Sequence, residues 1–545
     1  MDKRTLLAVV LSLAVLMGYQ YFFQTPPRTP GESVQNSGEA AGKTENIPQE
    51  ITGDQGTHAT PGIDRRKSLT KKDEDKGAGK DVVVEGPMYA AIFSSRGAGL
   101  KSFKLKDYRK DMSIDSALVE LVNVGRSTDY PLTTTFPESS IDIPTDVIYE
   151  SNLDSVDFTD AVNAKTLIFS WSYPGEISVD KIYTFYPDRY SFDLEVRLTN
   201  LSDDTFKENA LIEWNRYFDP SEKTDRYSHE GPISYVKDKV VSEKVKKLGA
   251  REFSGPDVSW GGCETKYFIA AMIPEQPSLT NFMVSKDSKD MVFTALEGPK
   301  SIIPPSQSGS FRYSLYLGPK KYSNLKAQNV GLENSIDFGS WVKWLALPLL
   351  QAINWINKYV HNYGVAIIIL TILVKLIFWP LGNISYKSMR GMQKLQPRMK
   401  ELQEKHKDDK AKLQQETMAL YKANNVNPMS GCFPMVIQLP VFFGLYRALL
   451  YSIELRHAPF IFWIQDLSAK DPYYITPIVM GATMFLQQRM SPAPGGNEIQ
   501  AKMMMWMPVI FTFLFLNFPS GLVIYWLFNN VLSIGQQYYI NKKNP

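Results

Sequence analysis

One basic residue lies inside a long apolar stretch of this sequence. Residues 359–380 (YVHNYGVAIIILTILVKLIFWP) are long and apolar enough to cross a bilayer, and Lys375 lies in their second half. An ammonium group at that depth is costly unless it faces a polar space or extends to the membrane surface. Lys375 is only about 8 Å along a helix from Pro380, so extension to the surface is one reading. If Lys375 faces a polar space, its positive charge would attract negatively charged groups there.

Polar side chains in the other apolar stretches favour the polar space. Thr371 is four residues before Lys375, so both share one helical face. The remaining polar residues are Gln438, Thr483, Gln487, Asn529, Ser533 and Gln537. The predicted topology places nearly all of them in the inner leaflet. This distribution indicates a cavity that is open to the cytoplasm and closed outside, because a through-pore would be polar along its whole depth.

Six membrane spans would position these residues, with both chain termini in the cytoplasm. The spans are predicted at residues 1–23, 359–380, 431–452, 473–488, 503–518 and 522–540, followed by a short tail at 541–545. Lys3 and Arg4 precede the first span, which ends in aromatic rather than small residues and is therefore interpreted as an uncleaved anchor. Residues 24–80 lack aromatic residues and are predicted to be a disordered external tether.

A basic segment separates the second and third predicted spans. Residues 387–422 contain ten Lys or Arg and five Asp or Glu, a net charge of +5, which places this loop in the cytoplasm. Apolar residues at heptad spacing predict a helical hairpin over 384–428, with Pro397 kinking or starting its first helix. Its basic residues, Lys394, Arg398, Lys400 and Lys405 among them, are interpreted either as a solvated face or as a surface for the ribosome, a targeting factor or anionic lipid.

Residues 81–325 have the alternating pattern of a soluble β domain. The clearest strand is YSFDLEVRLT from Tyr190, and similar short runs recur without a long helical period. A large antiparallel sandwich is therefore expected. Trp214, His229, Glu230 and the segment 260–263 are candidates for a site, but their spacing matches neither a nucleophile–base pair nor metal ligands. No catalysis, metal or cofactor is predicted, and a net charge of +3 gives no reason to expect nucleic acid.

Two smaller features complete the prediction. Residues 338–358 form an amphipathic stretch with three tryptophans, interpreted as a helix on the outer membrane surface or as a helix packed on the β domain. Arg447 lies near the outer end of its span without polar company and is predicted to extend to lipid phosphate. Cys263 and Cys432 fall on opposite sides of the bilayer and should not pair.

Three motifs resemble a known family. GCFPMVIQLPVFFGLYRAL from Gly431, DLSAKDPYYITPIVMG from Asp466 and NFPSGLVIYW from Asn517 are similar to the YidC/Oxa/Alb group of membrane protein insertases. The core resemblance covers residues 338–540. The anchor and large external domain resemble the Gram-negative form, whose inner-membrane protein has a periplasmic β-supersandwich related to galactose mutarotases.

The resemblance implies an energy-independent insertase and chaperone with a five-helix core. Its hydrophilic groove carries an arginine on the second span, where this sequence has Lys375 within TILVKLIFWPL. Lysine keeps the charge but loses the guanidinium fork. Groove contacts would come from Thr371, Gln438, Thr483, Gln487, Asn529, Ser533 and Gln537, and an apolar segment would leave along Leu439, Pro440, Phe511 and Phe515. The implied partners are nascent membrane proteins, the Sec translocon, lipids, the ribosome and the signal recognition particle receptor.

Two other classes stay open from the residues alone. A small-solute transporter or channel would also need an intramembrane charge, but it predicts an internal repeat or Gly/Pro-broken helices in matching halves, and the sequence shows neither. A periplasmic binding module merely anchored by the spans is the second alternative. Deletion of most of residues 81–325 would separate an insertase from such a binding module. An insertase core should keep its activity without them, whereas a binding module should lose its activity.

Overall fold

The computed structural model describes most of the chain after residue 66. The chain divides into residues 1–63 and 64–545, and the first unit lies wholly outside the described residues, as does the predicted anchor at 1–23. The described ranges are 67–69, 79–113, 115–137, 139–221, 228–249, 252–339, 341–406, 409–424, 426, 433–490 and 498–543.

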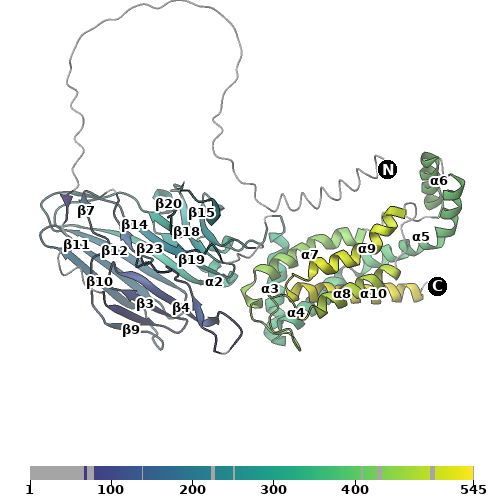
Figure 1. Cartoon of the computed structure of the whole chain (residues 1–545), viewed down its shortest axis with the longest axis horizontal. Coiled ribbons are helices and arrows are strands. Elements are labelled where there is room, and N and C mark those ends of the chain that lie inside the picture. The colour runs from purple at the N-terminus through teal and green to yellow at the C-terminus, as the bar shows by residue number, and fades with distance from the viewer. Residues whose placement is uncertain are drawn as a thin grey trace, which may run out of the picture. The chain divides into compact units, whose positions relative to one another are not determined.

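A nine-stranded sheet forms the centre of the β domain (Figure 1). Its strands, in spatial order, are β16 (Lys239–Ser242), β15 (Gly231–Val236), β18 (Val258–Glu264), β19 (Phe268–Pro274), β23 (Ser308–Pro319), β12 (Ser191–Asn200), β11 (Ile177–Phe185), β10 (Lys165–Tyr173) and β8 (Glu150–Ser151). The alternation expected from Tyr190 onward is present in β12, where Phe192, Leu194 and Val196 are buried. The prediction of a large all-β domain is confirmed.

Two five-stranded sheets pack on the same face of the central sheet. One consists of β5 (Leu118–Glu120), β4 (Gly99–Arg109), β3 (Tyr89–Ser94), β2 (Asp81–Glu85) and β9 (Ser155–Asp157). The other consists of β17 (Glu252–Ser254), β20 (Asn281–Lys286), β21 (Met291–Glu297), β14 (Leu211–Tyr217) and β6 (Thr134–Thr135). Phe93 of β3 contacts Phe192, and Phe282 of β20 lies over Gly261. Phe192, Leu315, Met272 and Gly261 are paired across neighbouring strands and therefore share that face.

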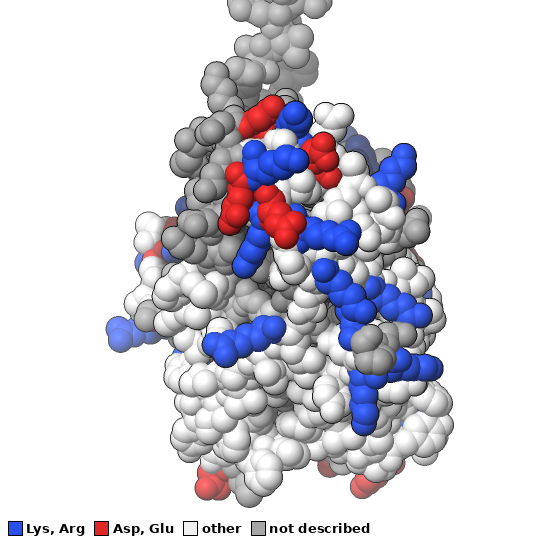
Figure 2. Space-filling model, turned by 90° about the vertical axis from the view of Figure 1, so that its right-hand side faces the viewer, with Lys and Arg blue, Asp and Glu red and all other residues white. Residues whose placement is uncertain are grey.

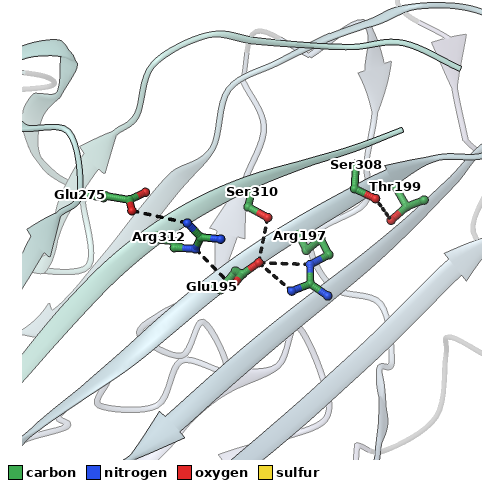
Figure 3. Close-up of polar contacts among 7 residues, drawn as sticks. All are labelled: Glu195, Arg197, Thr199, Glu275, Ser308, Ser310 and Arg312. Carbon is green, nitrogen blue, oxygen red and sulfur yellow. Dashed lines mark hydrogen bonds and ion pairs between the residues drawn. The ribbon is translucent and has the colours of Figure 1, made fainter. Parts of the chain in front are cut away.

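The opposite face of the central sheet is polar. Glu195 of β12 accepts hydrogen bonds from Arg197 and Arg312, and Arg312 also contacts Glu275 (Figure 3). Ser310 donates to the same Glu195 carboxylate. Strand alternation explains this division, because the residues between the buried positions of β12 point to solvent.

The predicted tether needs one correction. Lys67–Ser68 form β1, which pairs in parallel with β7 (Ile141–Asp142), and Leu69 is buried in the β-domain core. A second short pair joins β13 (Phe206–Glu208) to β22 (Ser301–Ile303). Composition averages over the whole of residues 24–80, so it misses a single apolar side chain that has a specific place in a core.

Eight longer helices follow the β domain and the short segments α2 (Tyr322–Lys326) and η4 (Leu332–Ser335) within the described residues. They are α3 (Lys343–Val360), α4 (Tyr363–Ile377), α5 (Trp379–Lys405), α6 (Lys410–Ala423), α7 (Phe433–Tyr451), α8 (Ile475–Met490), α9 (Glu498–Phe515) and α10 (Ser520–Lys543). Figure 1 shows α3, α4 and α7 to α10 running alongside one another, while α5 leads away to α6.

Several predicted helix boundaries are wrong. The stretch 359–380 is not one helix, because α4 ends at Ile377 and Pro380 lies in the first turn of α5. Pro397 lies inside α5 and does not start a helix. α9 begins at Glu498 rather than 503, and α10 continues through residues 541–543 of the predicted tail. A proline has no N–H to lose in the first turn of a helix, so Pro380 fits there well.

A helix must be both long and apolar to cross a bilayer, and the described helices differ in both properties. No single one of them is both long enough and apolar enough to cross, whereas α4 and α5 together pass on length and composition, with a bend of 65° between them.

Helix α3 contacts two separate cores. Ala346 and Leu350 belong to the buried cluster of the β domain, while Leu349, Ile353 and Ile356 belong to the cluster of the helices. Of the two interpretations of residues 338–358, packing on the β domain is therefore correct for one face of the helix. Trp344 and Trp355 are exposed.

Arg447 does not extend freely as predicted. Its guanidinium donates to the Asp337 carboxylate at 2.8 Å and lies over the Tyr451 ring. The prediction took into account only neighbours along the span, whereas Asp337 is 110 residues from Arg447 in the sequence.

Candidate functional site: a polar cluster among the helices

The polar residues predicted from the sequence lie on helices that contact one another. Lys375 is in the last turn of α4, Gln438 is on α7, and Thr483 and Gln487 are on α8. Asn529, Ser533 and Gln537 follow one another at four-residue spacing on α10, which packs against α4, α7 and α8. α10 is therefore the element that presents polar side chains to the other helices.

The central contact joins Lys375 to α10. The Lys375 ammonium donates to Ser533 Oγ at 2.6 Å, and Ser533 Oγ in turn donates to the Asn529 carbonyl at 2.7 Å. No carboxylate among the described residues is within ion-pair distance of Lys375, and the sequence has no Asp or Glu between residues 359 and 400. The Lys375 ammonium is thus held by a neutral partner.

Side-chain hydrogen bonds extend this contact to α7 and α8. Gln438 donates to Asn529 Oδ1, and Gln537 donates to the Met490 carbonyl at 2.7 Å. Asn530, which the sequence analysis did not include, donates to Thr483 Oγ1 at 3.3 Å. Helix periodicity placed Asn529 and Ser533 on one face but could not show that the adjacent Asn530 reaches α8.

Two predicted groove residues have other contacts. Thr371 is buried, and its hydroxyl donates to the Ile367 carbonyl one turn earlier, so it makes no hydrogen bond to Lys375. Gln487 lies near Tyr386 of α5, which also lies near Ser533. Tyr386 is a further residue that the sequence analysis missed, because residue 386 was expected to lie in the cytoplasmic hairpin at 384–428.

The opposite end of the helices is closed by packed side chains. The loop between α7 and α8 is bonded to the start of α10, since Ser520 N and Oγ both donate to the Ala469 carbonyl, at 2.7 and 2.8 Å. Asp471 in the same loop is buried and accepts hydrogen bonds from Trp463 and from the backbone and hydroxyl of Thr476. The apolar core next to this loop includes Ile367 of α4, Val523 of α10 and Leu467 of the loop itself.

The predicted apolar exit is only partly at the surface. Leu439 is exposed, and Pro440 and Phe511 are half-buried. Phe515 is 1% exposed and packs against Trp526 and Phe518, so its side chain cannot line an open surface. The exposed apolar side chains on α9 include Ile510 and Phe513 instead. Periodicity along one helix did not indicate which face Trp526 of α10 would cover.

The predicted hairpin residues lie on α5. Lys394, Arg398, Lys400 and Lys405 are exposed, and Leu395 and Met399 pack against Tyr421 of α6. Figure 2 shows this end of the molecule, with Lys and Arg side chains spread across it and Asp and Glu gathered beside some of them in one part. Residues 407–409 between the two helices were expected to form the turn of the hairpin; Asp409 caps the start of α6, while residues 407 and 408 lie outside the described residues.

Several candidate residues of the β domain are buried. Trp214, Trp260 and Cys263 are buried, and burial raises the pKa of the Cys263 thiol to about 12. His229 bonds the Pro232 carbonyl, and burial lowers its pKa. The described residues contain no group of three or more His, Cys, Asp or Glu that could hold a metal ion. Cys432 lies outside the described residues.

Comparison with known proteins gives the same family over both halves of the chain. The family model for the YidC periplasmic domain matches residues 81–352, and the model for the 60Kd inner membrane protein matches residues 355–545. The membrane protein insertase YidC of Syntrophus aciditrophicus is 56% identical over 548 residues and covers 100% of both chains. The chain belongs to the YidC family of membrane protein insertases. The YidC protein of Geobacter metallireducens is also similar, with 41% identity over 99% of this chain and 98% of its own.

Solved structures were also compared. A crystal structure of an active YidC insertase, with its first transmembrane domain resolved, covers 85% of this chain and 95% of its own at 20% identity, with a TM-score of 0.37. A galactose mutarotase related enzyme from Lactobacillus acidophilus covers 44% of this chain and 97% of its own at 12% identity, with a TM-score of 0.29. TM-scores this low do not establish a shared fold, so membership of the YidC family rests on the sequence matches.

Proposed function

We propose that this protein inserts proteins into the bacterial inner membrane through a polar cavity open to the cytoplasm. The observation that carries the proposal is Lys375, which bonds Ser533 and has no carboxylate partner among the described residues. An unneutralised ammonium group between apolar helices attracts an incoming acidic segment. Membership of a family of membrane protein insertases supports this reading.

The proposed cavity lowers the cost of moving a hydrophilic segment into the bilayer. Gln438, Asn529, Ser533 and Gln537 offer amide and hydroxyl groups that replace part of the water around that segment. Thr483 and Gln487 extend the polar surface on α8, while Thr371 supports the helix below Lys375. The closed outer end retains the segment until its apolar part leaves, so only part of the bilayer thickness remains to be crossed.

The apolar part of the client would leave between α7 and α9. Leu439 and Pro440 on α7 and Phe511 on α9 line this route in our proposal, together with the exposed Ile510 and Phe513. Transfer of an apolar helix into lipid is favourable by itself. The sequence contains no Walker motif, so partitioning and the membrane potential would drive insertion.

The proposed setting is a six-span protein of the inner membrane. Both termini would lie in the cytoplasm and the β domain in the periplasm, because basic residues cluster on the predicted cytoplasmic side. The exposed lysines of α5 would face the ribosome, the signal recognition particle receptor or anionic lipid. The protein would work alone or with the Sec translocon and would also help its clients to fold.

Replacement of Lys375 tests the proposal. In proteoliposomes, Lys375→Leu should slow insertion of a single-span client with an acidic translocated segment by about 10-fold, while Lys375→Arg should stay within about 2-fold of the wild type, because the arginine keeps the charge. A photo-crosslinker at Pro440 should capture the same client during insertion. Crosslinks to lipid only, together with unchanged insertion by Lys375→Leu, would rule out the proposed cavity and favour another role, such as solute transport.

A further inference from the structure

Gln536 joins α10 to the first turn of α5. Its side chain is buried, and Nε2 donates to the Trp379 carbonyl and to Asn383 Oδ1, both at 3.0 Å. A Cβ atom on Gly382 would lie 2.6 Å from the same nitrogen, so the amide is seated directly on this glycine. Gln536 thus contacts the beginning of α5 at three neighbouring residues.

This contact lies at the break between α4 and α5. α4 ends at Ile377, α5 begins at Trp379, and their axes differ by 65°. Pro380 has no N–H, so the hydrogen-bond ladder that would fix the direction of a continuous helix is interrupted here. The angle must therefore be set by contacts from other elements, and Gln536 provides two of them.

The same face of α10 also receives Lys375. Ser533 is three residues before Gln536, so the two side chains are neighbours on the helix surface. Ser533 bonds Lys375 in the last turn of α4, and Gln536 bonds the first turn of α5. Further along the two helices, Arg390 of α5 donates a hydrogen bond to the Asn541 carbonyl of α10 at 2.8 Å, which is a second contact between them.

We infer that Gln536 is a positioning residue, which fixes the bend between α4 and α5 so that the Lys375 ammonium stays on Ser533. The inference rests on the proposed function, since the role of Gln536 is expressed through Lys375. Loss of the Gln536 amide would free the first turn of α5, let the end of α4 rotate, and move the charge away from the polar cluster.

A double-mutant cycle tests this role in full-length protein reconstituted in proteoliposomes. Lys375→Leu and Gln536→Leu should each slow insertion of an acidic client about 10-fold, and the double variant should be no slower than either one, because both changes remove the same interaction. Insertion of a matched client with a neutral translocated segment should stay within about 2-fold. A purely structural role for Gln536 would slow both clients equally.

A pair of glycine variants provides the matched control. Gly382→Ala leaves Gln536 intact but displaces its amide, and it should reproduce the selective loss for the acidic client. Gly535→Ala adds the same methyl group on α10 where nothing lies within 4 Å, and it should insert both clients at the wild-type rate. This pair also supplies the test if Gln536→Leu does not accumulate in the membrane.

Three outcomes would overturn the inference. They are losses that multiply to about 100-fold in the double variant, equal losses for the acidic and neutral clients, and normal insertion of the acidic client by Gly382→Ala and Gln536→Leu. If Lys375→Leu slows the acidic client while Gln536→Leu does not, only the positioning role fails. If Lys375→Leu itself has no effect, the proposed cavity fails as well.

Discussion

Lys375 and Lys181 are both held by neutral partners, without a carboxylate among the described residues, and their surroundings differ. Lys375 bonds one hydroxyl and is half-buried, and in the proposed function an acidic segment approaches it. Lys181 in β11 is fully buried, and its amine bonds the carbonyls of Gly97, Ala98 and Leu132 at 3.1, 3.2 and 2.6 Å. Lys181 is therefore a structural residue that joins β11 to two loops.

The buried amine should make the stability of the β domain depend on pH. Burial lowers the pKa of Lys181 from 10.5 to about 7, so between these values the unfolded chain binds more protons than the folded one. The free energy of unfolding of the wild type, relative to Lys181→Met, should therefore rise as the pH increases from about 7 toward 10 and be constant below 7. Urea unfolding of the full-length protein, detected by the protease sensitivity of the β domain, measures this difference in the free energy of unfolding. A difference that does not change between pH 7 and 10 would contradict the prediction.

At the scale of elements, each helix is defined by what covers its faces. α5 and α6 are joined by a small cluster of Leu395, Met399 and Tyr421, separate from the main helix core. Tyr421 donates a hydrogen bond to Met399 Sδ at 2.7 Å. The heptad spacing predicted the contribution of α5 to this cluster, whereas Tyr421 was not among the expected contacts of α6.

α9 offers a direct comparison between a covered and an open face. Phe515 packs against Trp526 with ring centroids 5.3 Å apart, whereas Phe513 is 68% exposed. Phe515→Ala should lower the free energy of unfolding by about 3 kcal/mol, because it leaves a cavity in a packed aromatic cluster. Phe513→Ala should change it by less than about 0.5 kcal/mol. Thermal unfolding in detergent micelles compares the two, and equal losses would show that Trp526 does not select one face of α9.

At the scale of the whole molecule, the helical part of the chain contributes residues to the core of the β domain. Ala448, Tyr451 and Ile453, at and just after the end of α7, belong to the buried cluster of the β domain. Arg456 also donates to the carbonyls of Arg109 and Lys110 at 2.6 and 3.0 Å. Removal of the β domain would therefore expose apolar surface on the remaining helices.

Deletion of residues 81–325 should separate activity from stability. We expect the truncated chain to insert an acidic client at a rate within about 3-fold of the full chain at low temperature, because the polar cluster is built entirely from helices. Its unfolding temperature should fall by at least about 5 °C, because the apolar ends of α3 and α7 lose their cover. Complete loss of insertion at a temperature where the helices remain folded would place part of the site in the β domain.

The sequence by itself determined the class of the protein and the types of residue at the candidate site. Strand alternation from Tyr190 and the apolar stretches are local patterns, so they can be recognised without knowledge of the fold. Lys375 and the stripe of Asn529 and Ser533 were found for the same reason, since helical periodicity fixes which residues share a face.

Tertiary structure alone decided which of those residues meet. The bond between Lys375 and Ser533 spans 158 residues, and the partner of Arg447 is 110 residues away, so no local pattern contains either contact. The burial of Phe515 and the seat of Gln536 on Gly382 depend on neighbouring helices in the same way. A periodic pattern gives the direction of a side chain from its own helix, but what occupies that direction is set by the packing of the whole chain.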